Sequence, residues 1–385
     1  MENTKNIKQI IALLLVIAVF VVAGCLGLKN QNGPASVLVS IEPIKIGFVG
    51  PLTGDVAVWG QSGLAGAELA TKEVNDMGGI NGRKIELIIE DDNTSEGGSV
   101  NAVNKLINID KVTALLLGGG SGATASVVPI AQSNKIPSMV TIASMPSITS
   151  VGDYIFRSTQ SDSSQGKFAA DFVFDTLDKK NISIIYVTNA WGAGVEGVFK
   201  KEYLAKGGKI IYENGVLETD IDLKGELFKV KNNGSDALYF PVYPANALAG
   251  FKQIKELGIT IPVVSGDTID GNDILKNPVA EGIIYTAPKI YSPEEFLRKI
   301  NSLKGFETLQ PNTAAPTSYD GAKILFSAIE RAGTNDSSKI KEELMKTSYV
   351  GVSNPVMEFD KNREVRTPVF EAKIVKNGVV ESYTE

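Results

Sequence analysis

The sequence predicts an α/β protein of two doubly wound lobes, each built on a parallel sheet. From Ile44 onward, short apolar runs of strand length alternate with amphipathic stretches of helical length. Strands that are separated by helix-length crossovers pair in parallel and are covered on both faces. The alternation continues to Thr141 and resumes at Ile182, and the segment 142–165 between them is loop-like. Two lobes are therefore expected rather than one large sheet.

The individual elements follow from the same alternation. Strands such as Thr-Ala-Leu-Leu-Leu and Ile-Ser-Ile-Ile-Tyr-Val are nearly continuously apolar, which is typical of strands buried on both faces. The expected strands cover residues 44–49, 85–90, 113–117, 137–141, 182–187, 209–212, 237–240 and 262–265. The expected helices cover residues 61–77, 99–107, 124–134, 165–177, 195–206, 223–231 and 245–257.

Composition excludes several kinds of chemistry. The 385 residues include no histidine and one cysteine. Without histidine, Ser-His-Asp and Cys-His catalysis and zincin-type metal sites are ruled out, and one cysteine cannot form an internal disulfide or an iron–sulfur cluster. The adjacent acids Asp91 and Asp92 supply too few ligands for a metal ion. The formal charge of −6 does not indicate a nucleic-acid-binding surface. We expect no cofactor, no metal and no nucleic-acid partner.

The N-terminus has the pattern of an export signal. Lys5 and Lys8 precede an apolar run over residues 10–23, which is the length of a signal-peptide core and too short to span a membrane. The small residues before Cys25 resemble a lipoprotein cleavage site. We expect a signal peptide at 1–24, a lipid anchor on Cys25 and a flexible tether at 25–43. The alternative is an uncleaved N-terminal anchor, and either arrangement places the chain outside the cytoplasm, on the outer face of the membrane.

Polar and aromatic residues follow the expected strands. In doubly wound folds ligands bind beyond the carboxyl ends of the strands. Trp59 follows the first strand, Ser121 lies in a Gly-rich loop after the third, and Ser144 follows the fourth. In the second lobe the corresponding loops carry Trp191, Tyr243 and Asp267. Taken singly, each has an ordinary structural explanation, such as a helix cap, a turn or packing. Together they predict a cleft with anion donors on one wall and an acid on the other, which suits a zwitterion with an apolar body.

The Gly-rich loop at residues 118–123 formally matches a dinucleotide-binding pattern, but the acidic residue expected after the next strand is missing. No Gly-Lys-[Ser/Thr] follows, so it is no P-loop. What remains is a set of backbone N–H groups and one hydroxyl at a helix N-terminus, which suits a carboxylate.

Several motifs occur in order along the chain: Ile44-Lys-Ile-Gly-Phe-Val-Gly-Pro-Leu-Thr-Gly54, Trp59-Gly60, Gly66-Ala-Glu-Leu-Ala70, Asn75-Asp-Met-Gly-Gly-Ile-Asn-Gly82 and Glu90-Asp-Asp92. Together they resemble the leucine/isoleucine/valine-binding protein family of ABC importers. The resemblance extends from Ile44 to the C-terminus. It implies a type I periplasmic-binding fold whose two lobes are joined by three hinge crossings, expected at 157–160, 286–288 and 354–358. Lobe I would then comprise 44–158 and 288–354, and lobe II 159–287 and 355–385.

The resemblance also implies a role for each residue of the expected cleft. Ser121 and the Ser144 hydroxyl would bind the α-carboxylate of an amino acid, while the Ile142 carbonyl and Asp267 would bind its α-ammonium. The aromatic residues Trp59, Trp191 and Tyr243 would line the side-chain pocket. Two tryptophans in place of the tyrosines common in relatives enlarge the aromatic walls, and the Gly118-Gly119-Gly120 run leaves the shape of the carboxylate pocket open.

The resulting hypothesis is an amino-acid-binding protein that closes over an apolar, branched-chain-type ligand and delivers it, as a monomer, to membrane permease subunits. Two alternatives stay open: a sensory component that reports ligand to a partner, and a binder of a neutral amide or urea. An enzyme has little support, because neither Ser121 nor Ser144 has a lysine base nearby in the sequence.

Overall fold

The computed structural model describes residues 42–54, 56–270, 273–289, 291, 293–309 and 312–384. The expected signal peptide, Cys25 and nearly all of the expected tether lie outside the described residues. In the described part, no helix is long and apolar enough to cross a membrane. The same ranges contain no group of three or more acids or cysteines placed to hold a metal ion.

The first sheet is wholly parallel. Its strands lie in the order β2-β1-β3-β4-β5, so the order reverses between β1 and β3. Such a reversal is the switch point at which doubly wound sheets bind ligands. The strands are β1 (Ile44–Gly50), β2 (Ile85–Asp91), β3 (Ala114–Leu117), β4 (Ser138–Val140) and β5 (Ile155–Arg157).

The second sheet repeats this arrangement and extends it. Strands β7-β6-β8-β9-β10 are parallel, with the switch point between β6 and β8. Strands β11 and β12 add an antiparallel hairpin at the β10 edge, which the expected all-parallel lobe lacked. The strands are β6 (Asn181–Val187), β7 (Lys209–Val216), β8 (Ala237–Phe240), β9 (Val263–Ser265), β10 (Ile284–Pro288), β11 (Phe370–Lys376) and β12 (Val379–Ser382).

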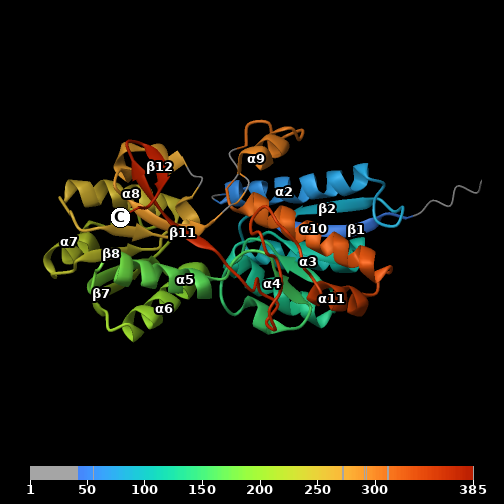
Figure 1. The fold of residues 1–385 in the computed structure, drawn as a ribbon, viewed down its shortest axis with the longest axis horizontal. Coiled ribbons are helices and arrows are strands. Elements are labelled where there is room, and N and C mark those ends of the chain that lie inside the picture. Colours follow the sequence, from blue (N-terminus) through green and yellow to red (C-terminus); the bar gives the residue numbers. More distant parts are fainter. Residues whose placement is uncertain are drawn as a thin grey trace, which may run out of the picture. The chain divides into compact units, whose positions relative to one another are not determined.

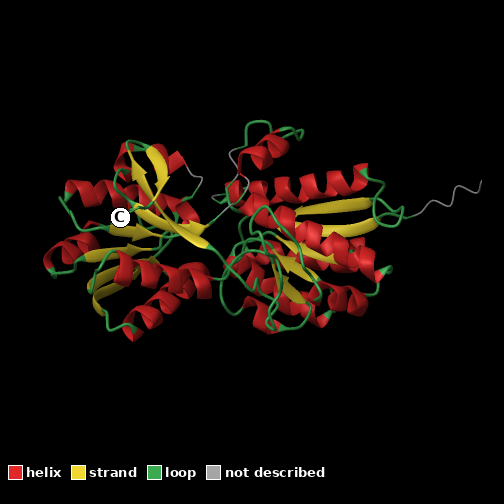
Figure 2. Ribbon diagram, in the orientation of Figure 1, coloured by secondary structure: helices red, strands yellow, loops and turns green. Residues whose placement is uncertain are grey.

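Helices cover both sheets, as Figures 1 and 2 show. Those on the first sheet are α2 (Ala57–Asp76), α3 (Glu96–Lys105), α4 (Ser121–Ser133), α9 (Pro293–Asn301), α10 (Ala314–Ala332) and α11 (Ser337–Met345). Those on the second are α5 (Asp162–Asp171), α6 (Ala190–Ala205), α7 (Lys224–Asn232) and α8 (Pro244–Glu256). Short π-helical turns, Leu106–Asp110 and Phe172–Thr176, extend α3 and α5. Helices α9, α10 and α11 had no counterpart among the expected elements.

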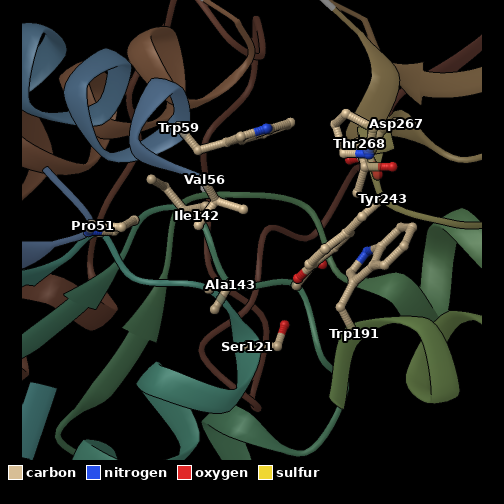
Figure 3. A pocket seen from close by; sticks show the side chains of 14 residues that line it. Pro51, Val56, Trp59, Ser121, Ile142, Ala143, Trp191, Tyr243, Asp267 and Thr268 are labelled. Carbon is tan, nitrogen blue, oxygen red and sulfur yellow. The ribbon is translucent and has the colours of Figure 1, made fainter. Parts of the chain in front are cut away.

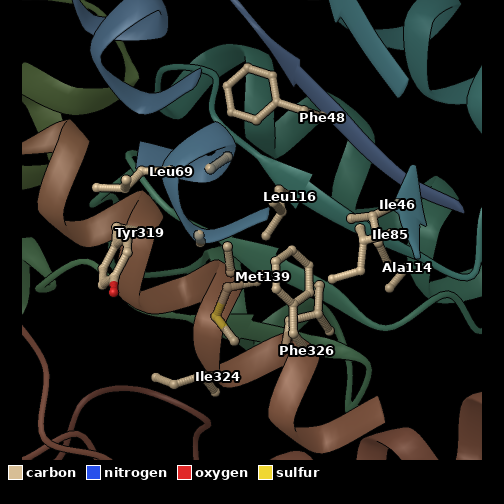
Figure 4. Close-up of a cluster of buried hydrophobic side chains, with 14 of the residues drawn as sticks. Ile46, Phe48, Leu69, Ile85, Ala114, Leu116, Met139, Tyr319, Ile324 and Phe326 are labelled. Carbon is tan, nitrogen blue, oxygen red and sulfur yellow. The ribbon is translucent and has the colours of Figure 1, made fainter. Parts of the chain in front are cut away.

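The core explains why the strand sequences are continuously apolar. In β3, Ala114 and Leu116 face a cluster built with α2 and α10, whereas Leu115 and Leu117 face one built with α3 and α4. Figure 4 shows the first cluster, where Leu116 lies among side chains from β1, α2 and α10. Burial on both faces removes the polar alternation of a half-exposed strand.

The chain passes between the sheets three times, and two of the passages lie at positions that differ from those expected. The first passage lies between β5 and α5, where a crossing at 157–160 was expected, although the preceding segment that was expected to be a loop contains the strand β5. The second comes after Pro288, because residues 286–288 still pair with β11. The third lies beyond Val365 rather than at 354–358, because Met357, Phe359 and Val365 pack in the core of the first sheet. The segment expected to begin lobe II at residue 355 therefore packs with the first sheet.

Candidate ligand-binding site

A pocket lies at the switch points of both sheets. Its lining residues come from the segments that follow β1, β3 and β4 in the first sheet and β6, β8 and β9 in the second. It encloses about 590 Å³ of space, including space open to solvent. The lining residues are Pro51, Val56, Trp59, Gly118, Gly120, Ser121, Ile142, Ala143, Ser144, Trp191, Tyr243, Pro244, Asp267 and Thr268.

All seven residues singled out from the sequence line this pocket (Figure 3). Trp59, Ser121 and Ile142 lie on the side of the first sheet, and Trp191, Tyr243 and Asp267 lie opposite. The apolar lining residues Pro51 and Val56 were not anticipated. Both lie in the segment between β1 and Trp59.

The wall from the first sheet centres on the N-terminus of α4. Gly120 is the N-cap of this helix and Ser121 its first residue, so its free backbone N–H groups lie beside the pocket. The Ser121 hydroxyl oxygen accepts a 3.3 Å hydrogen bond from the backbone N–H of Met145, which connects the loops after β3 and β4. A helix N-terminus with an adjacent hydroxyl favours an anionic group.

The wall from the second sheet is aromatic. The rings of Trp191 and Tyr243 stack with centroids 5.6 Å apart and an interplanar angle of 25°. Trp191 is held at the start of α6, where the Asn189 side chain caps the helix by accepting from the Gly192 N–H at 2.8 Å. A Cβ on Gly266 would lie 3.1 Å from the Trp191 ring, so this glycine lets the indole pack against the β9 loop.

The acid of this wall is Asp267, in the short helical turn Asp267–Ile269 after β9. Its Oδ1 accepts a 3.0 Å hydrogen bond from Nε2 of Gln165. Burial raises the pKa of Asp267 to about 6, the Gln165 bond opposes that rise, and the charge of Asp270 adds to it. Asp267 is therefore largely ionised at neutral pH.

A larger cavity adjoins the pocket and shares Trp59, Ser121, Trp191 and Tyr243 with it. Its lining adds three acids, Asp92, Glu96 and Glu218. Among the described residues, no lysine or arginine lines either cavity. The approach to the pocket is therefore negative, which favours cationic groups over anions.

Two further residues behind the pocket were missed by sequence reasoning. Asp162 is the first residue of α5 and is completely buried, and Gln165 follows it one turn later. The backbone N–H of Asp162 donates a 2.9 Å hydrogen bond to the carbonyl of Ser144, a pocket residue. Both lie at the end of the segment interpreted as a loop between lobes, so no strand-end rule pointed to them.

A family model described as periplasmic binding protein matches residues 43–378. The chain belongs to the periplasmic binding protein family. This confirms the family and the two-lobed type I fold expected from the sequence motifs.

Three proteins that are similar to this chain differ in the ligands given for them. The leucine-, isoleucine-, valine-, threonine- and alanine-binding protein of Pseudomonas aeruginosa is 26% identical over 321 residues, which are 82% of this chain and 86% of that protein. A branched-chain amino acid substrate-binding protein of Streptococcus pneumoniae, solved with isoleucine, is 27% identical with a TM-score of 0.79 and covers 88% of this chain and 98% of its own. A solute-binding protein of Rhodopseudomonas palustris, solved with 3,4-dihydroxybenzoic acid, shares the fold at 23% identity and a TM-score of 0.78, covering 89% of this chain and 96% of its own.

Proposed function

We propose that this protein binds an apolar amino acid, of the branched-chain class, in the pocket between its two sheets, and delivers it to an ABC permease on the outer side of the membrane. The single observation that carries the proposal is the pairing of an acid, Asp267, with the N-terminus of α4 on opposite walls of one pocket. A zwitterion presents one group to each. Seven residues would make the contacts: Trp59, Ser121, Ile142, Ser144, Trp191, Tyr243 and Asp267.

The amine end would bind Asp267. A charge-assisted hydrogen bond between an ammonium and a carboxylate gains strength in surroundings from which water is excluded. The absence of lysine and arginine from the described lining means that no side-chain cation competes for this acid. The Ile142 carbonyl would accept a second hydrogen bond from the ammonium.

The carboxylate end would bind the N-terminus of α4, the Ser121 hydroxyl and the Ser144 hydroxyl. The positive end of the helix dipole and the unpaired N–H groups stabilise an anion without any basic side chain. This arrangement suits the carboxylate of a zwitterion better than that of an aromatic acid, which would bring a net negative charge toward Asp267, Asp92 and Glu96.

The side chain of the ligand would lie against Trp59, Trp191, Tyr243 and Val56. Aromatic and aliphatic walls gain free energy by removing apolar surface from water, at roughly 25 cal/mol per Å². A neutral amide or urea would leave the Asp267 carboxylate without a cation, which is costly in a buried site. The ligand would leave the pocket chemically unchanged, because no described residue there forms a nucleophile–base pair.

A thermal-shift screen tests this proposal. The panel contains the common amino acids, benzoate, 3,4-dihydroxybenzoate, urea and acetamide. A ligand that binds the folded state raises its stability in proportion to RT ln(1 + [L]/Kd), so at about 100 times Kd the gain is about 2.7 kcal/mol.

We expect leucine, isoleucine or valine to give the largest shift, and the aromatic acids and amides to give none. A shift with benzoate but not with any amino acid would contradict the proposal. Recovery of the bound amino acid unchanged after incubation separates binding from catalysis.

A further inference from the structure

A buried carboxyl group stands behind the ligand pocket without a described hydrogen-bond donor. Asp162 is completely buried, and neither of its carboxylate oxygens has a hydrogen-bond partner among the described residues. Its backbone N–H is bonded to the Ser144 carbonyl, so the residue is fixed directly behind the pocket wall. Nothing in the proposed ligand contacts uses this group.

The surroundings of Asp162 contain charges of both signs. The negative charge of Asp267 acts on it from the pocket and that of Glu364 acts from the segment before β11, while the Arg157 guanidinium opposes them. Arg157 is itself engaged by Glu364, by the Ser161 hydroxyl at 2.9 Å and by the Met145 carbonyl at 2.7 Å. Its charge is therefore shared with these partners.

Other polar groups near Asp162 do not neutralise it. The Tyr239 hydroxyl on β8 is buried without a described partner, and burial, followed by the charges of Asp162, Asp267 and Glu196, raises the pKa of this phenol. The Ser144 hydroxyl is near enough to oppose the rise of the Asp162 pKa, but burial and Asp267 dominate and raise that pKa to about 8. A buried carboxyl group with few donors is more stable in its neutral form.

Asp162 and Asp267 are thus two acids with different partners. Asp267 receives the Gln165 amide and faces the pocket, whereas Asp162 lies deeper and has no such donor. At neutral pH the pair holds one proton, which resides on Asp162. Burial of Asp162 is the largest cause that keeps the proton there, and the negative charge of Asp267 adds to it, because the two negative charges repel each other.

We propose that Asp162 is a positioning residue for amine-bearing ligands: it is a neutral carboxylic acid in the ligand-free protein and ionises when a ligand ammonium pairs with Asp267. The inference rests on the proposed function. The ammonium neutralises the charge of Asp267 and adds a positive charge beside Asp162, so the O–H bond of Asp162 breaks and its proton leaves to solvent. Charge is conserved: the site gains one negative charge, and one proton is released per ligand bound.

This arrangement makes the pocket selective for a cation over a neutral or anionic group. A ligand without an ammonium group leaves Asp162 protonated, so it gains nothing from the second acid. As pH increases toward the pKa of Asp162, the affinity for an amine-bearing ligand then rises by up to about tenfold per pH unit. The affinity stops rising once Asp162 is ionised in both the ligand-free and the ligand-bound protein.

Isothermal titration calorimetry of the full-length protein tests the inference. The amino acid with the largest thermal shift, for which L-leucine is the expected probe, is titrated at pH 7 in phosphate and in Tris, whose ionisation enthalpies differ. The dependence of the observed enthalpy on buffer gives the number of protons exchanged. We expect release of close to one proton per ligand at pH 7, since about nine-tenths of a group with a pKa near 8 is protonated there.

Two variants identify the side chain that releases the proton. Asp162→Asn keeps the shape of the side chain and should release no proton. The affinity of this variant for L-leucine should match that of the original protein at pH 6. At pH 8 the affinity of the variant should be about tenfold or more below that of the original protein. Glu196→Gln is the matched control, because Glu196 is a buried acid on α6 that lines neither cavity. It should retain the proton release.

The outcomes separate the two proposals. Tight binding without proton release overturns this inference and leaves the proposed function standing, and so does release that persists in Asp162→Asn. Absence of binding by any amino acid overturns both. If Asp162→Asn does not fold, the titrations of the original protein and of Glu196→Gln still decide whether a proton is released and whether Glu196 is its source.

Discussion

The side-chain amide of Gln165 donates a 3.0 Å hydrogen bond to Oδ1 of Asp267. Gln165 is buried in α5, the first helix after the chain passes from the first sheet to the second. Asp267 lies in the turn after β9 and lines the pocket. This bond therefore joins the acid of the candidate site to the helix that begins the second lobe.

Loss of this bond should weaken ligand binding in a pH-dependent way. Gln165→Leu keeps the approximate shape but removes the donor that favours the ionised form of Asp267, so the pKa of Asp267 rises further above its usual range. A hydrogen bond to a charged group contributes about 1.5–3 kcal/mol, which corresponds to a loss of affinity of about 10- to 150-fold. Calorimetry with L-leucine should find the larger loss at pH 6 and the smaller at pH 8.

Gln253→Leu is the matched control for that variant. Gln253 on α8 is also buried, and its amide bonds to Leu223 and Ile221, neither of which lines the pocket. It should lower the melting temperature without changing the affinity. Equal losses of affinity in both variants would contradict a specific role for Gln165.

Removal of the Ser121 hydroxyl should have a smaller effect than removal of the acid. In Ser121→Ala the free N–H groups at the start of α4 remain to bind the ligand carboxylate. We expect a loss of about 1 kcal/mol, or about fivefold in Kd. A larger loss in Ser121→Ala than in an Asp267 variant, measured by calorimetry at pH 8, would show that the carboxylate end dominates binding.

Folding stability should depend on pH through Asp162. Its pKa is about 8 in the folded protein and about 3.9 when unfolded, so the folded state binds the proton more tightly. The proton on Asp162 therefore stabilises the folded state fully below about pH 4. This contribution to the free energy of unfolding is lost as pH rises through 8, by on the order of 1.4 kcal/mol per pH unit.

Asp162→Asn does not titrate and should escape this loss. In the absence of ligand, its melting temperature relative to that of the original protein should increase from pH 5 to pH 8. A difference that stays constant over this range would argue that Asp162 is already ionised in the folded protein.

The packing of the first lobe depends on a glycine. A Cβ on Gly66 would lie 2.1 Å from the backbone carbonyl oxygen of Ala315, so α2 and α10 can approach only because no side chain intervenes. Gly66→Ala should reduce the free energy of unfolding by about 1–3 kcal/mol or more. Gly97→Ala, on α3 with open space around the added methyl group, should cause no loss. Denaturant unfolding of both variants checks this, and equal stabilities would contradict the packing argument.

The pocket residues could be predicted because strand ends locate them. Ser121, Tyr243 and Asp267 each follow a parallel strand, and the carboxyl ends of parallel strands lie at one edge of the sheet. Asp162 and Gln165 could not be found in this way. Their position depends on where the chain turns from one sheet into the other, and that is determined by tertiary packing around β5.

The C-terminal hairpin of β11 and β12 could have been predicted from the sequence. Asn377 and Gly378, with φ of 53° and 71°, form the two-residue turn between β11 and β12. Asn-Gly between apolar runs is a strong hairpin signal. The third passage was misplaced for a different reason: Met357 and Phe359 are buried in the first lobe through contacts with residues distant in sequence.

The pairing of a ligand ammonium with Asp267 is tested by calorimetric titration of the original protein and of Asp267→Asn with L-leucine at pH 8. Removing the charge of Asp267 leaves the ligand ammonium without its partner, which should cost about 3–5 kcal/mol, or about two to four decades of affinity, while the melting temperature without ligand is retained. We expect the original protein to bind L-leucine and the variant to lose this binding. Unchanged affinity in a folded Asp267→Asn protein would contradict this pairing.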